Sequence, residues 1–279
     1  MAYRQRAFRR SGLLGSVLQM DTPAYARRVD GGSATRAVLR AAAVVATAWG
    51  VPKQRRLGLA LAAAVSSAVA FARIAEDYLT NDPLARWDVS FARWLSGERS
   101  DVGTDFFRVV TFLGSPAAAL AIATVVCVLL YRRRRLVEAA LLPVVLAGAE
   151  LLNLVLKLSF HRPRPEYAFV HLETYSFPSG HAMVSTAAYG ALAYLAWSNL
   201  RTRQARLVLS AGTAVLLALI CFSRLYLGVH YLSDVLAGAA GGAFWLAISI
   251  ALQTIYGERL ATGFAGSWVD RFGRRITRS

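Results

Sequence analysis

Long apolar runs alternate with short charged segments along most of the chain. Six of the runs come near the roughly 20 residues that a helix needs to cross the hydrocarbon core of a bilayer. They cover residues 57–75, 109–131 or 116–131, 136–156, 180–197, 207–222 and 235–255. This pattern predicts an all-α protein, a polytopic membrane helical bundle with about six transmembrane helices.

Two further segments have mixed patterns. Residues 38–49 are apolar, but the run is short and is followed by Val51-Pro52-Lys53, which favours an interfacial or re-entrant helix over a seventh span. Residues 82–108 interleave tryptophans and aliphatic residues with balanced charge. We interpret this stretch as an amphipathic extracytoplasmic segment at the level of the lipid headgroups.

Arginine clusters indicate the orientation. An even number of spans places both termini on one side, and the basic clusters before the first run and after the second, fourth and sixth runs all fall on that side. The positive-inside rule identifies this side as cytoplasmic. We therefore expect an Arg-rich cytoplasmic segment over residues 1–55, a membrane domain over residues 56–256 and a basic cytoplasmic tail over residues 257–279.

Composition supports a membrane protein. Apolar residues make up 56% of the 279 residues, and the mean hydropathy is +0.42. The net charge of +16 could suggest nucleic acid, but the basic residues cluster between apolar runs instead of following one surface, so no nucleic-acid partner is expected. Only two of the 32 basic residues are lysines, which makes Lys157, at the end of the third run, a candidate functional residue.

Three short segments carry the chemistry, and all lie at ends of runs that the topology places outside. The first contains Lys157 and the sequence Arg162-Pro163-Arg164-Pro165. Alternating prolines hold a chain extended, so this loop can present its guanidinium groups from a stiff backbone. Taken alone, contact with lipid headgroups would explain these cations equally well.

The second segment, Pro178-Ser179-Gly180-His181, comes directly before an apolar helix. Backbone N–H groups and the Ser179 hydroxyl can point at an anion there, where the helix dipole also favours negative charge. Gly180 lets a phosphate group approach the main chain closely. A plain helix start accounts for the first three residues but leaves His181 unexplained.

The third segment holds Ser223-Arg224, His230 and Asp234. Four residues of helix place the Asp234 carboxylate beside the His230 ring, where it can accept the Nδ1 proton and leave the other nitrogen as a nucleophile. Arg224 can clamp phosphate oxygens with a planar guanidinium group. A surface helix pair is the alternative for His230 and Asp234 taken alone.

Together these segments resemble the three-part signature of the type-2 phosphatidic acid phosphatase, or lipid phosphate phosphatase, superfamily. Every signature position is present, in the order Lys157-x6-Arg164-Pro165, Pro178-Ser179-Gly180-His181 and Ser223-Arg224-x5-His230-x3-Asp234. Vanadium haloperoxidases and soluble acid phosphatases share this signature, so it specifies a pocket more securely than a substrate. The predicted spans favour the lipid branch of the superfamily.

The resemblance implies a role for each position. His230 would attack phosphorus and form a phosphohistidine, with Asp234 orienting its ring, while His181 would protonate the leaving oxygen and then activate water. The phosphate oxygens would be held by five positions: Lys157, Arg164, Ser179, Gly180 and Arg224. No metal or other cofactor is implied, and no cluster of acidic ligands lies near these motifs.

The expected function is that of an integral membrane lipid phosphatase in a bacterial inner membrane, with its pocket at the extracytoplasmic surface. The superfamily suggests a polyprenyl diphosphate such as undecaprenyl diphosphate, from cell-wall carrier recycling, as the first substrate, followed by phosphatidylglycerol phosphate and phosphatidic acid. A phosphotransferase using the same phosphohistidine is the alternative within enzymes. A lipid or anion transporter is the other, although charged motifs gathered at one surface argue against it.

Several neighbouring residues could support the site. Glu150, Asn153 and Lys157 share one helical face, although hydrogen bonding between helices explains Glu150 equally well. Ser223 precedes Arg224 in the signature. For the loop residues His161, His171 and Glu173, contact with water is favoured over contact with a headgroup.

Overall fold

The computed structural model describes residues 52–80, 83–169 and 173–276, all within one compact unit, residues 41–279. The helix predicted at residues 38–49 and the loop residue His171 lie outside the described residues. The described part contains eight helices and no strand, which confirms the all-α prediction.

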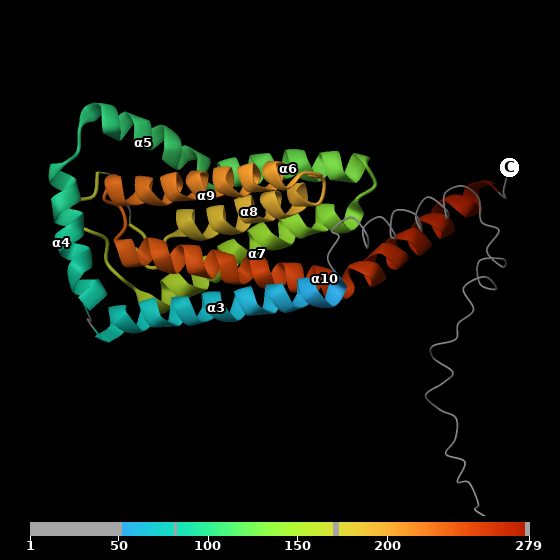
Figure 1. Cartoon of the computed structure of the whole chain (residues 1–279), viewed down its shortest axis with the longest axis horizontal. Coiled ribbons are helices and arrows are strands. Elements are labelled where there is room, and N and C mark those ends of the chain that lie inside the picture. The colour runs from blue at the N-terminus through green and yellow to red at the C-terminus, as the bar shows by residue number, and fades with distance from the viewer. Residues whose placement is uncertain (1–51, 81–82, 170–172, 277–279) are drawn as a thin grey trace, which may run out of the picture. The chain divides into compact units, whose positions relative to one another are not determined.

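The helices follow one another along the chain and include two pairs of special interest, a bent pair and a crossing helix. Their bounds are α3 (Lys53–Thr80), α4 (Pro83–Gly97), α5 (Asp101–Leu113), α6 (Pro116–Arg132), α7 (Leu136–Phe160), α8 (Gly180–Trp197), α9 (Arg203–Tyr226) and α10 (Leu232–Ile276). Five long helices, α3 and α7 to α10, lie side by side, and α4 runs across one end of them (Figure 1).

Four of the described helices are long and apolar enough to span a membrane: α3, α7, α9 and the first part of α10, Leu232–Gly257. The pair α5 and α6, bent by 44°, would make a fifth if it forms one span. This count is below the predicted six because α8 does not qualify. The chain is nevertheless a multi-pass membrane protein by these helices, and the break between α5 and α6 favours the shorter of the two predicted second runs.

The position of α8 explains its composition. Its residues Ala182, Met183 and Ala187 are fully buried against α6, α7 and α10. A helix enclosed by other helices does not need a lipid-soluble surface, so polar residues are tolerated within it. The outer helices show the opposite pattern, because they expose large apolar side chains to the surroundings, including Leu59, Val65, Val125, Leu151 and Val208.

Glycines let α10 approach α8 closely. A Cβ atom placed on Gly238 would lie 2.4 Å from the carbonyl oxygen of Ser179 and 3.0 Å from the Cβ of Ala182. Small residues at such crossings allow membrane helices to pack backbone to backbone. The contact fixes α10 against the turn that begins α8.

Gly238→Ala should therefore destabilise the protein by about 1–3 kcal/mol, since the methyl group meets backbone that cannot move aside cheaply. Melting temperatures in detergent would measure the loss. Gly212→Ala on α9 is the matched control, because a Cβ there meets nothing within 4 Å, and alanine in a helix is about 0.5–1 kcal/mol more favourable than glycine. Equal melting temperatures for the two variants would contradict the close packing at Gly238.

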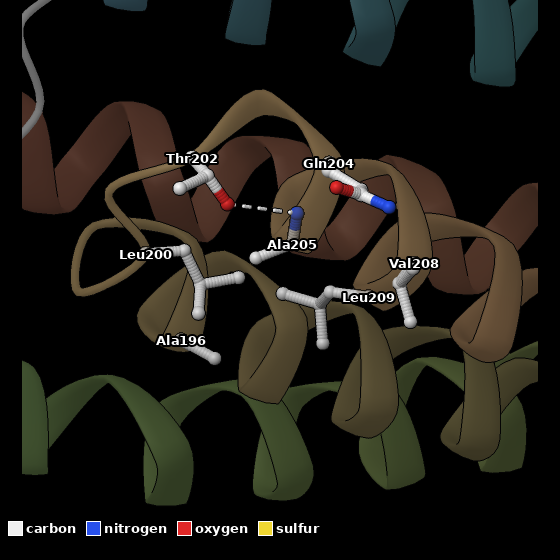
Figure 2. Close-up of a pocket in the computed structure, with 7 residues that line it drawn as sticks. All are labelled: Ala196, Leu200, Thr202, Gln204, Ala205, Val208 and Leu209. Carbon is white, nitrogen blue, oxygen red and sulfur yellow. Dashed lines mark hydrogen bonds between the residues drawn. The ribbon is translucent and has the colours of Figure 1, made fainter.

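The direction of each helix gathers the three motif segments. α7 and α9 end, and α8 and α10 begin, at the end of the bundle that α4 crosses (Figure 1). The basic turns at residues 132–135 and 201–206 lie at the other ends of these helices. An apolar hollow near the second of these turns contains neither histidine nor a cation (Figure 2); it is lined by Ala196, Leu200, Thr202, Gln204, Ala205, Val208 and Leu209.

Candidate active site

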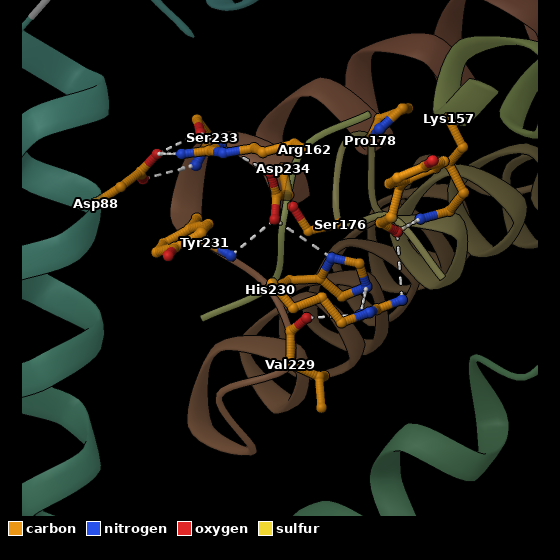
Figure 3. Close-up of polar contacts among 12 residues, drawn as sticks. Asp88, Lys157, Arg162, Ser176, Pro178, Val229, His230, Tyr231, Ser233 and Asp234 are labelled. Atoms are coloured by element: carbon orange, nitrogen blue, oxygen red, sulfur yellow. Dashed lines mark hydrogen bonds and ion pairs between the residues drawn. The ribbon is translucent and has the colours of Figure 1, made fainter. Parts of the chain in front are cut away.

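His230 lies in the short turn between α9 and α10 and is buried, with 3% of its surface exposed. Its Nδ1 is 3.4 Å from Oδ2 of Asp234, and its Nε2 is 3.3 Å from Nη1 of Arg164 (Figure 3). A guanidinium group can only donate, so Nε2 accepts and the ring proton is on Nδ1, facing the carboxylate. This is the tautomer in which Nε2 offers a lone pair.

Burial lowers the pKa of His230 well below its usual value, and the positive charges of Arg224, Arg164 and Lys157 lower it further. The imidazole is therefore neutral at physiological pH. A neutral ring keeps its Nε2 lone pair available for attack on phosphorus.

This lowered pKa makes stability depend on pH. Below about pH 6.5 the unfolded chain protonates His230 and the folded protein does not, so the free energy of unfolding falls as pH falls, by up to about 1.4 kcal/mol per unit. Above that pH neither state is protonated and the effect vanishes. Melting temperatures from pH 7.5 to 5 should fall more steeply for the wild type than for His230→Gln; parallel curves would show that His230 is not held neutral.

Arg164 is fixed by the loop backbone on both sides of the site. Its Nε donates to the carbonyl of Thr174 at 2.7 Å, its Nη2 to the hydroxyl of the same residue at 2.8 Å, and its Nη1 to the carbonyl of Val229 at 2.6 Å. The extended Arg-Pro-Arg-Pro loop predicted from sequence thus presents this guanidinium beside His230. Its orientation does not depend on a bound anion.

Lys157 and Arg224 bring two further cations. The Lys157 ammonium donates to the carbonyl of Tyr175, and the charges of Arg164 and Arg224 both act on it. Arg224 is buried at the end of α9, and its Nη1 donates to Thr111 Oγ1 at 2.6 Å. Its Nε is also buried but has no hydrogen-bond partner among the described residues. Such a donor is costly to bury unless an acceptor reaches it.

The turn before α8 contributes a second donor of this kind. Ser179 is fully buried at the N-cap of α8, its N–H donates to the carbonyl of Asp234 at 2.9 Å, and its Oγ has no partner in the described part of the chain. Asn153 supports this turn, since its Nδ2 donates to the carbonyl of Pro178 at 3.3 Å. A Cβ on Gly180 would lie 2.9 Å from Asn153 Oδ1, so the position is confined to glycine by close approach.

His181 follows in the first turn of α8 and belongs to the same group of side chains. The charges that act on it come from Arg224, His230, Arg164 and Lys157. Its ring faces the break between α5 and α6, because a Cβ on Gly114 would lie 3.4 Å from its Cδ2. All the residues predicted to act on phosphate therefore meet at one end of the bundle.

Other predicted residues are placed elsewhere. Glu150 is exposed on the outer face of α7, and Ser223 is buried with its hydroxyl donating to the carbonyl of Ile220 in its own helix. His161 is exposed and packs its ring edge-on against Tyr175, and Glu173 is exposed. Among the described residues, no group of three histidine, cysteine or acidic side chains is placed to hold a metal ion.

Sequence analysis missed a buried ion-pair network behind His230. Arg162, interpreted with Arg164 as a headgroup contact, is instead 5% exposed and forms ion pairs with Asp234 and with Asp88 of α4 (Figure 3). A signal was present for Asp88, because it shares the buried face of α4 with Ala85, Ala92 and Leu95. A carboxylate in an apolar stripe needs a buried partner.

Comparison with known proteins agrees with this geometry. Residues 138–256 match the sequence profile of the PAP2 superfamily. The chain is 34% identical to phosphatidylglycerophosphatase B of Bacillus subtilis (strain 168) over 137 residues, which are 48% of this chain and 66% of that protein. The aligned part is thus just under two thirds of the relative.

Solved structures show the same fold. The crystal structure of a transmembrane PAP2-type phosphatidylglycerolphosphate phosphatase from Bacillus subtilis superposes with a TM-score of 0.62 and 27% identity, covering 73% of this chain and 96% of that one. LpxE of Aquifex aeolicus, with a TM-score of 0.48 and 24% identity over 58% of this chain and 94% of its own, is too distant to support an argument. By profile, relative and fold, the chain belongs to the PAP2 superfamily.

Proposed function

We propose that this protein is an integral membrane lipid phosphatase that works through a phosphohistidine at His230. The observation that carries the proposal is a set of buried donors left without protein acceptors, Ser179 Oγ and Arg224 Nε, in the same group as a neutral histidine. A phosphate group would satisfy both donors. Phosphoryl transfer depends mainly on such positioning and charge stabilisation.

The chemistry follows from the placement of the two histidines. The Nε2 lone pair of His230 forms a bond to phosphorus while the bond from phosphorus to the lipid oxygen breaks, and His181 donates a proton to that oxygen. His181 then takes a proton from water, the water oxygen bonds to phosphorus, and the bond to Nε2 breaks. Lys157, Arg164 and Arg224 offset the charge on the equatorial oxygens in both steps.

The name of the Bacillus relative makes phosphatidylglycerol phosphate the first substrate to test, ahead of the polyprenyl diphosphates that the sequence favoured. A membrane-bound site suits either lipid, because the tail can stay among the helices while the phosphate enters the end of the bundle. The basic turns at the opposite end support an extracytoplasmic site by the positive-inside rule.

Phosphate release by the purified protein tests the proposal. The substrates are phosphatidylglycerol phosphate, undecaprenyl diphosphate and phosphatidic acid, with EDTA present and vanadate as competitor. We expect release that persists in EDTA and is inhibited by vanadate. Labelled phosphate that appears only on a second alcohol would indicate a phosphotransferase, and no turnover of any of these lipids by the folded protein would refute the proposal.

A further inference from the structure

Arg162 is shared between two buried carboxylates. Its Nη1 donates to Asp234 Oδ1 at 2.8 Å and its Nη2 to Asp88 Oδ2 at 2.9 Å, and both aspartates are completely buried. The Asp234 oxygen that Arg162 contacts is not the one that faces His230, which is Oδ2. Arg162 and His230 therefore hold opposite oxygens of one carboxylate.

The charges of this group do not cancel. One guanidinium lies between two carboxylates, so the network behind His230 carries a net charge of −1. Burial lowers the pKa of Arg162, but Asp234 and Asp88 raise it by more, so the arginine stays charged. Without Asp88, Arg162 would neutralise Asp234 one to one, and electrostatic effects of this kind are large where water is excluded.

That charge matters at the moment of reaction. When Nε2 of His230 bonds to phosphorus, the ring keeps its Nδ1 proton and becomes positive, and a carboxylate facing Nδ1 stabilises it, as the aspartate of a serine-protease triad stabilises its imidazolium. A carboxylate already neutralised by an arginine does this less well. Asp88 therefore determines how much of the Asp234 charge reaches the ring.

Asp88 reaches this position from a helix that lies outside the region matched to the family profile. The buried face of α4 holds it against the start of α10, where Asp88 Oδ1 accepts the N–H of Ser233 at 3.0 Å (Figure 3). A negative charge is favourable at a helix N-terminus. The opposite face of α4 exposes Trp87 and Trp94.

We propose that Asp88 is a positioning residue for the phosphoryl transfer: by sharing Arg162, it keeps the negative charge of Asp234 available to His230. The proposal rests on the function proposed above. It makes α4, which crosses the end of the bundle, a part of the catalytic unit in addition to a cover over it.

Asp88→Asn tests the charge with little change of shape, because the amide oxygen can still accept from Ser233. We expect kcat for the lipid substrate to fall about 10- to 100-fold, the usual cost of losing a residue that orients a reacting group. KM should stay nearly unchanged, since Asp88 touches none of the phosphate donors. Asp105→Asn is the control, because Asp105 is an exposed acid on α5 paired only with Arg108 at its own helix surface; its kcat should equal the wild-type value.

The double variant Asp88→Asn, Arg162→Met separates charge from structure. Methionine can fill the space between the rings of Tyr78 and Tyr231, which lie 4.6 and 4.3 Å from the Arg162 guanidinium, and removing both members of a buried ion pair costs less than removing one. Asp234 then carries the net charge of −1 by itself. We expect a kcat several times higher than that of Asp88→Asn, whereas a purely structural role predicts a further loss.

Each outcome decides the matter. Wild-type protein that releases no phosphate refutes the proposed function, and the question of Asp88 falls with it. If the wild type is active, an unchanged kcat in Asp88→Asn, a rise in KM that accounts for the whole loss, or a double variant no better than the single one would overturn the role of Asp88. If Asp88→Asn alone does not fold, the double variant decides: kcat within about tenfold of the wild type supports the proposal, and a larger loss or failure to fold overturns it.

Discussion

Replacing His230 with glutamine should lower kcat for phosphate release by about four orders of magnitude or more, the scale seen when an enzyme loses its nucleophile. Glutamine can still donate to Asp234 and accept from Arg164, so the buried contacts of the ring at 3.4 and 3.3 Å remain possible for the variant. Only the nucleophilic nitrogen is lost. The expected result is a folded protein that binds substrate but does not turn it over.

Rapid-quench experiments with labelled substrate would measure this directly. The wild type should carry label that survives alkali and is lost in acid, as a bond between phosphorus and nitrogen does, and His230→Gln should carry none. His161→Asn is the control, because His161 is exposed and its backbone lies in the left-handed region, at φ 49°, which asparagine tolerates. Normal turnover in a folded His230→Gln protein would rule out His230 as the nucleophile.

The phosphate-binding residues could be predicted from sequence because each motif is local. The turn at residues 178–181 begins a helix, and the spacing of His230 and Asp234 places one beside the other whatever else the chain does. The helices that end and begin beside these motifs were equally visible as apolar runs. Their convergence followed from an alternating topology and needed no knowledge of packing.

The network behind the site could not be predicted in the same way. Asp88 and Ser233 are 145 residues apart in the chain, and their contact depends on how α4 crosses the start of α10. Sequence spacing gives the faces of a helix but not the partner of each face. Arg162 was assigned to solvent and headgroups for the same reason, since its burial comes from Asp88 and from the rings of Tyr78 and Tyr231.

The number of spans shows a related limit. The run at residues 180–197 does form a helix, but its surroundings are other helices, so hydropathy underestimates how deeply it is embedded. The second run was ambiguous because Gly114 and Ser115 interrupt it; Ser115 caps α6 by accepting from the N–H of Ala118 at 3.1 Å, and Pro116 begins the helix. α10 continues to Ile276, well past the predicted end at residue 255.

Replacing His181 with asparagine should separate the two chemical steps. His181 lies in the first turn of α8 under the charges of Arg224 and His230, where it can exchange a proton with the leaving oxygen and then with water. Loss of a general acid and base costs about 10²- to 10⁴-fold. We expect a loss in this range for lipid substrates, whose alkoxide is a poor leaving group.

An aryl phosphate with an acidic leaving group needs no proton in the first step, so His181→Asn should still be phosphorylated by it. The second step still needs a base to activate water, and the variant should therefore accumulate phosphoenzyme that the wild type hydrolyses at once. Tyr189→Phe on the same helix is the control, since it removes only a hydrogen bond to the carbonyl of Leu113. An equal loss with both classes of substrate, without accumulated phosphoenzyme, would remove His181 from proton transfer and leave it a role in binding alone.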